Sequence, residues 1–97
     1  MEISDRLSAL SGEIAEEQTQ LRILEEQVTF QQEVSEDARV RALVSETPLA
    51  DREAREAADD LVRLVRSRED VLRRLADLRA EQDTLLERML EAQDQRQ

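Results

Sequence analysis

Residues 40–51 read VRALVSETPLAD and contain the chain's only proline, Pro48. Ser45 favours a turn, Thr47 is a good helix N-cap, and proline is well tolerated at the first position of a helix. The stretch therefore predicts that one helix ends here, that residues 45–47 form a turn, and that a second helix begins at the proline.

Apolar residues recur at alternating spacings of three and four on both sides of this stretch. Such a repeat places side chains on one helix face and is typical of a coiled-coil seam. It predicts a first helix over about residues 3–44 and a second over about residues 48–93. The seam is interrupted by Glu17, Arg68 and Gln82. Its residues on the first helix are Ile3, Leu7, Leu10, Ile14, Leu21, Leu24 and Val28, and on the second Ala54, Ala57, Leu61, Leu64, Val71, Leu75, Leu78, Leu85, Met89 and Ala92.

Two long helices joined by so short a turn must run antiparallel. The predicted fold class is all-α: an antiparallel helical hairpin, built as a coiled coil, in a single domain of residues 1–97. Folding the chain back at the turn places Val28 near Leu64 and Leu21 near Val71. The apolar seam of the first helix therefore faces that of the second, which supports the hairpin independently. Small residues also face one another near the turn, where the helices should approach closely: Ser35, Ala38, Ala54 and Ala57.

The apolar surface is wider than one seam requires. A second stripe lies about 115° around the first helix, and further apolar residues flank the seam of the second helix. A two-helix hairpin cannot bury them all, and exposed apolar patches mark interfaces. We expect two hairpins to pair as a homodimer in a four-helix bundle, although a larger partner could cover the same surface. The residues are Ile23, Phe30 and Val34 on the first helix, and Val62, Val65, Leu72, Leu86 and Leu90 on the second.

The turn region carries another candidate interaction site. Val40, Leu43, Val44 and Leu49 crowd the tip of the hairpin, where few residues remain to cover them. Loops and tips often carry function, so this cluster is a candidate for binding a partner protein. The alternative is a structural plug that caps the end of the bundle.

The composition removes most catalytic chemistry. The 97 residues include no histidine and no cysteine, so the most common general base, the most common metal ligand and thiolate chemistry are missing. Neighbouring carboxylates such as Glu16 and Glu17 are expected to lie on a solvated face, because a thin bundle offers no pocket. We therefore expect no catalytic, cofactor-binding or metal-binding residues, and a protein that is not an enzyme.

The net charge of −10 argues against nucleic acid or an anionic membrane as a ligand, since both are negatively charged. The charge is uneven: residues 1–47 hold 11 acids and 4 arginines, and residues 48–97 hold 13 acids and 10 arginines. No signal-peptide pattern and no long apolar run is visible, so we expect a cytoplasmic protein. All 14 basic residues are arginine, which indicates a GC-rich bacterial genome.

These patterns predict a non-enzymatic coiled-coil interaction module or adaptor that self-associates and binds an unidentified partner protein. The alternative is a transcription regulator of the anti-sigma or polymerase-binding type, acting through an acidic helical face. The hairpin plan and the acids Glu46, Asp51 and Glu53 near the tip resemble bacterial transcription modulators that insert a coiled-coil tip into the polymerase channel, although those normally carry a globular domain as well. Residues 64–74 resemble the hairpin of anti-sigma factors that bind cyclic-di-GMP, but their ligand motif is absent, so nucleotide binding is not implied.

Overall fold

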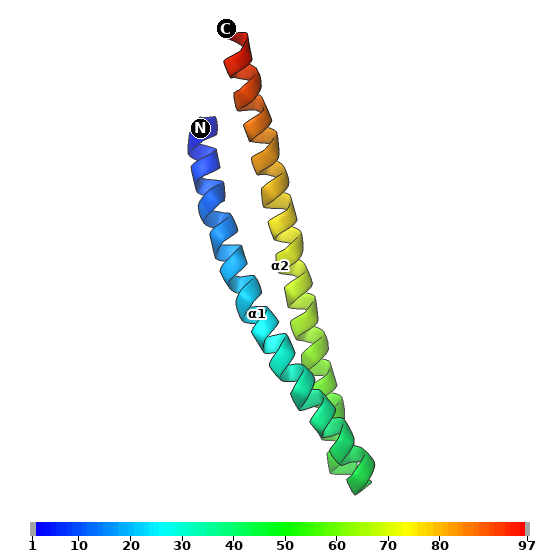
Figure 1. Cartoon of the computed structure of the whole chain (residues 1–97). Coiled ribbons are helices and arrows are strands. Elements are labelled where there is room, and N and C mark those ends of the chain that lie inside the picture. The colour runs from blue at the N-terminus through cyan, green and yellow to red at the C-terminus, as the bar shows by residue number, and fades with distance from the viewer. Residues whose placement is uncertain (1, 97) are drawn as a thin grey trace.

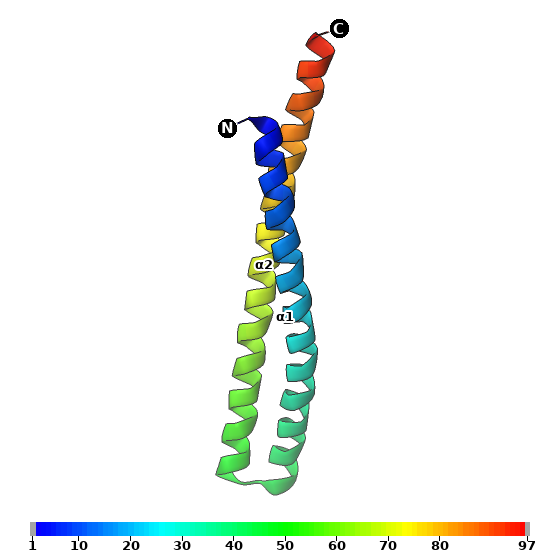
Figure 2. The same cartoon turned by 90° about the vertical axis from the view of Figure 1, so that its left-hand side faces the viewer.

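The computed structural model describes residues 2–96, which form two long helices in a thin rod of 76 × 17 × 15 Å. Helix α1 spans Ile3–Ser45 and helix α2 spans Pro48–Gln95. Figure 1 shows the helices side by side, with both chain ends at one end of the rod and the turn at the other. Figure 2, turned by 90°, shows that they wind around each other, as a seven-residue repeat requires. The predicted all-α hairpin is confirmed.

The helix ends lie close to the predicted ones. Helix α1 ends one residue beyond the predicted limit and α2 two residues beyond it. Helix α2 continues through Gln95, and Gln97 lies outside the described residues.

The turn is made by two residues, each of which caps one helix. Glu46 adopts the left-handed conformation (φ 51°, ψ 39°), and its backbone N–H donates to the Ala42 carbonyl at 3.1 Å. The Thr47 hydroxyl accepts from the Ala50 N–H at 3.1 Å, which confirms the predicted N-cap ahead of Pro48. Glycine usually occupies the left-handed position after a helix, so Glu46 carried no sequence signal for this role.

The core of the rod is the seam between the helices. Leu10 is fully covered, and Leu75 is 2% exposed. On α1 the same spacing continues beyond the apolar seam residues, through smaller or polar residues that are half-buried or buried. These are Gln31, Ser35, Ala38 and Ala42. The buried hydrophobic residues of the two helices together are Leu10, Val28, Ala38, Ala57, Val71, Leu75 and Leu85.

The prediction that Ala92 lies in the buried seam is wrong. Ala92 is exposed, because α2 is longer than α1 and its last turns extend past the start of the first helix (Figure 1). An apolar repeat on one helix has no buried face where the partner helix has ended.

Small residues of both helices line the part of the seam toward the turn, where Ala38 and Ala57 are buried. That the helices approach more closely there stays a prediction. There the Gln31 side-chain amide donates across the seam to the Ala57 carbonyl at 3.0 Å. A side chain on one helix can reach the backbone of the other because Ala57, with only a methyl group, does not hold the helices apart.

Leu75 tests the register of the seam, because its side chain is buried and faces a charged residue, Glu17, on the other helix. Leu75→Asp should place a carboxylate in a dry layer that already holds part of Glu17, and we expect the free energy of unfolding to fall by about 2–5 kcal/mol. Thermal melting followed by circular dichroism measures the loss. The matched control is Ala76→Asp on the exposed neighbour, and equal melting of the two variants would contradict the register.

Candidate functional site

Exposed apolar side chains form three surfaces on the rod. Phe30 on α1 is 67% exposed, Leu72 on α2 is 46% exposed, and Val44 near the turn is 79% exposed. We call the surfaces by the elements that carry them. The α1 stripe is Ile23, Phe30 and Val34; the α2 stripe is Val62, Val65 and Leu72; the tip cluster is Val40, Leu43, Val44 and Leu49.

Not every stripe residue is fully exposed. Val34 and Val65 are half-buried, because each lies beside the seam. Leu72 also lies beside the seam but is 46% exposed, whereas Ile23, Phe30 and Val62 lie farther around their helices. Leu86 and Leu90 are 45% and 61% exposed and continue the apolar surface of α2 toward its C-terminal end.

The two stripes lie on opposite faces of the hairpin. With the seam residues lettered a and d of a heptad, the α1 stripe occupies positions c and g, and the α2 stripe occupies b and e. In an antiparallel pair, g positions of both helices flank one side of the seam and e positions flank the other. Arg6 and Glu81 both stand at g, and their side chains bond across the seam, which shows the g side directly.

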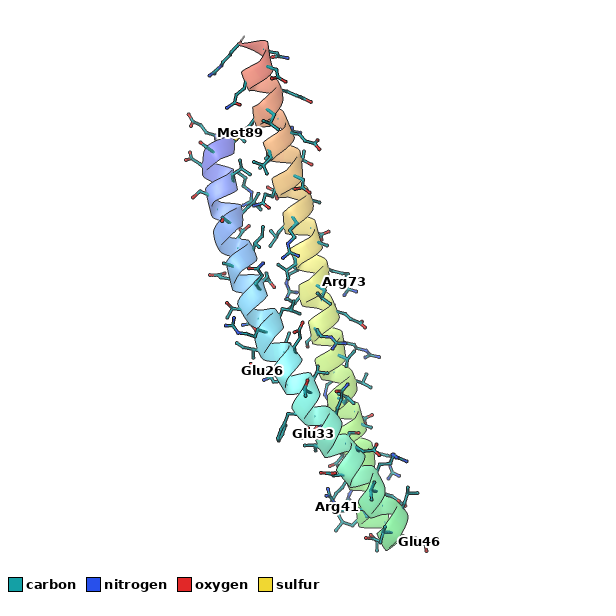
Figure 3. All side chains as sticks on the ribbon, in the orientation of Figure 1. Glu26, Glu33, Arg41, Glu46, Arg73 and Met89 are labelled. Atoms are coloured by element: carbon teal, nitrogen blue, oxygen red, sulfur yellow. The ribbon has the colours of Figure 1, made fainter. Side chains whose placement is uncertain are left out.

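The charges around the two stripes differ in their balance, with acids in excess around the α1 stripe and arginines in excess around the α2 stripe. Each stripe also has a charge of the other sign nearby: Arg22 shares a surface hollow with Phe30, and Asp59 lies one turn from Val62. Exposed acids surround the α1 stripe on its outer side, and Figure 3 shows Glu26 and Glu33 projecting from that helix. Exposed arginines line the α2 stripe, together with Glu69, and Arg73 also pairs with Asp70 on its own helix. The acids are Glu16, Glu26, Glu33 and Asp37, and the arginines are Arg66, Arg73 and Arg79.

The tip cluster is open to solvent. Its four residues are between 47% and 79% exposed, whereas Ala42 and Ala50 are half-buried and close the end of the seam. Within a single hairpin the cluster therefore plugs nothing. Figure 3 shows Glu46 at the extreme end of the rod, so a carboxylate lies beside this apolar surface.

An ion-pair cluster joins the helices toward the open end of the rod. The Arg6 guanidinium donates to both carboxylate oxygens of Glu81, at 2.5 and 2.9 Å, and also lies 3.4 Å from Glu13. The hydrogen bond from Arg6 lowers the pKa of Glu81, and the same bond raises the pKa of Arg6. Sequence analysis did not single out this cluster, although facing g positions of opposite charge were its signal.

The polar residues within the seam are only partly covered. Glu17 accepts from the Arg74 Nε at 3.2 Å through one oxygen, and its other oxygen is buried without a hydrogen-bond partner. Arg68 and Gln82 are half-buried. The contact with Arg74 places Glu17 beside Leu75, as the predicted register required.

The described residues contain no group of three or more acidic, histidine or cysteine side chains arranged to hold a metal ion. Within residues 2–96, neither helix has a stretch apolar enough to cross a bilayer. No protein-family model, curated protein or solved structure matches the chain.

The Arg6–Glu81 pair should make the hairpin sensitive to acid. The pKa of Glu81 is lowered on folding, so its ionised carboxylate stabilises the folded hairpin. This stabilisation is complete above the unfolded pKa of about 4.5 and is lost as the pH falls through the folded pKa. Glu81→Gln should therefore melt at a lower temperature than the parent at pH 7, and the difference should shrink as the pH falls below 4.5 and Glu81 takes up its proton.

Melting temperatures measured from pH 7 to pH 2 follow this difference. Glu87→Gln serves as the control, since Glu87 is exposed and makes no ion pair within residues 2–96. A gap between the parent and Glu81→Gln that persists unchanged in acid would show that the carboxylate charge is not the source of the effect.

Proposed function

We propose that the chain is a non-enzymatic coiled-coil interaction module that self-associates along its helical faces and binds a partner protein at its tip. The observation that carries the proposal is the exposed apolar surface that residues 2–96 present along the rod and at its tip. Such surfaces are uncommon on soluble monomers unless another molecule covers them.

Self-association is proposed to begin with a pair of hairpins. Contact through one face of each copy would bring four helices side by side, in the manner of a four-helix bundle. Because the two stripes lie on opposite faces, one such contact covers one stripe of a given copy and leaves the other exposed. This geometry supports association but does not favour a bundle in which both stripes of each copy turn inward together.

Light scattering at micromolar concentration tests self-association. The mass should be at least twice the chain mass of 11.2 kDa, because the stripes exclude water only when copies meet. Binding of an apolar dye should fall as the concentration rises. A folded monomer that binds no dye at any concentration would remove the basis of the proposal.

The alternative, a transcription regulator of the anti-sigma or polymerase-binding type, would use the same tip. Its support is the exposed carboxylates of Glu46, Asp51 and Glu53 close to the tip cluster. The two proposals differ in the partner: sigma factor or polymerase subunits recovered from the native host favour the regulator, and any other partner favours the general adaptor.

Replacing the tip cluster should separate stability from partner binding. The triple variant Leu43→Ser, Val44→Ser and Leu49→Ser alters only exposed side chains and keeps the Thr47 cap, so its melting temperature should change little. Partner recovery should fall by about tenfold or more, since compact apolar clusters carry most of the energy of an interface.

Leu90→Ser is the matched control for the tip variant. It removes an equally exposed apolar side chain at the other end of the rod, where no partner binding is proposed. Equal losses of partner recovery in the two variants would place the binding surface along the helices, and a large fall in melting temperature of the triple variant would identify the tip as structural.

A further inference from the structure

We infer that the α1 stripe of one copy binds the α2 stripe of a second copy, so that hairpins join side by side through two different surfaces. This inference rests on the self-association proposed above and specifies its geometry. It commits to a second copy of this chain as the occupant of both stripes.

Charge complementarity selects this pairing over its symmetric alternatives. A contact between two α1 stripes would bring the acids Glu16, Glu26, Glu33 and Asp37 of both copies together. A contact between two α2 stripes would do the same for Arg66, Arg73 and Arg79. Like charges that face each other across an interface disfavour it, and only the pairing of α1 with α2 sets acids against arginines.

The spacing of the apolar residues supports the same pairing. Along α1 the stripe residues Ile23, Phe30 and Val34 are separated by seven and then four positions. Along α2, counted backwards, Leu72, Val65 and Val62 are separated by seven and then three positions. Each stripe is therefore about 15 Å long. Laid antiparallel, Ile23 meets Leu72 and Phe30 meets Val65, and Glu16 then lies opposite Arg79. The same register sets Glu26 opposite Glu69, which has Arg66 and Arg73 one turn away on either side along its own helix.

The antiparallel register also sets how neighbouring copies are oriented. Helix α1 already runs antiparallel to α2 within one hairpin, so α1 of one copy can run antiparallel to α2 of the next only if both turns point the same way. Neighbouring rods would thus lie parallel, with their tip clusters at one end.

Because the two stripes lie on opposite faces of each hairpin, this contact can repeat from copy to copy. A copy that has used its α1 stripe still presents its α2 stripe on the other face, so a pair can add a third copy. An interface between two different surfaces closes only if the rotation between copies closes a ring, and otherwise it extends into a row.

Two variants, each with one blocked stripe, test the geometry. Phe30→Glu blocks the α1 stripe and Leu72→Glu blocks the α2 stripe, and both positions are exposed, so the hairpin should still fold. Each variant alone should be monomeric in sedimentation velocity runs. Mixed, they should form a one-to-one complex of twice the chain mass that grows no further, because the intact α2 stripe of one meets the intact α1 stripe of the other.

The parent chain and a tip variant complete the experiment. The parent should grow beyond a dimer as its concentration rises, and growth should weaken in high salt, where the charges are screened. Val44→Glu, an equally drastic change at the tip, should assemble like the parent, and circular dichroism confirms folding of every variant.

The outcomes that would contradict the inference differ from those that would contradict self-association itself. If one variant alone still dimerises while the other does not, and mixing gives no complex, copies join through identical surfaces; the inference is then wrong and self-association stands. If the parent is monomeric at all concentrations, both the inference and the proposed self-association fail.

Discussion

The fit between the turn and the two heptad seams is the constraint on which the rest of the structure depends. Because Glu46 and Thr47 reverse the chain in two residues, the layers of α1 are brought opposite those of α2 without a slip. A slip by one residue would displace the facing layers by about 1.5 Å along the rod, so that the side chains of one helix would no longer fit between those of the other. The left-handed Glu46 and the Thr47 cap therefore determine the pairing of residues more than 70 positions apart in sequence, such as Arg6 and Glu81.

The sequence predicted the helices, their limits and the register, since a repeat sustained over many turns leaves few alternatives. It predicted neither the partner of Arg6 nor the link from Gln31 to Ala57, because long polar side chains reach several partners and only the packed helices select one. The sequence also predicts the angle around each helix between its stripe and its seam. We conclude that the two stripes lie on opposite faces of the hairpin only when this angle is combined with the antiparallel pairing of the helices. Ala92 was assigned to the seam because its own helix carries the repeat, while burial depends on the helix opposite.

The candidate sites lie outside the seam for a physical reason. A rod 15 to 17 Å wide has room for one layer of side chains between its helices, so the recognition proposed for it would use its faces or its end. Each of the three apolar surfaces has a distinct electrostatic setting: acids beside the α1 stripe, arginines beside the α2 stripe, and a carboxylate at the tip. Surfaces that share apolar character and differ in charge can select different partners.

The graded size of the seam residues has a mechanical consequence. Between Leu7 and Val28 the layers are filled mainly by leucine, isoleucine and valine, whereas from Gln31 to Ala42 they contain mainly alanine, serine and glutamine. A rod of this kind is nearly one-dimensional, in that each layer is supported only by the layers beside it, and its cohesion can vary along its length. Fewer apolar atoms are buried per layer in the half near the turn, so we expect that half of the seam to be the less cohesive one. The proposed binding surface at the tip would then be carried by the half of the rod that opens more readily.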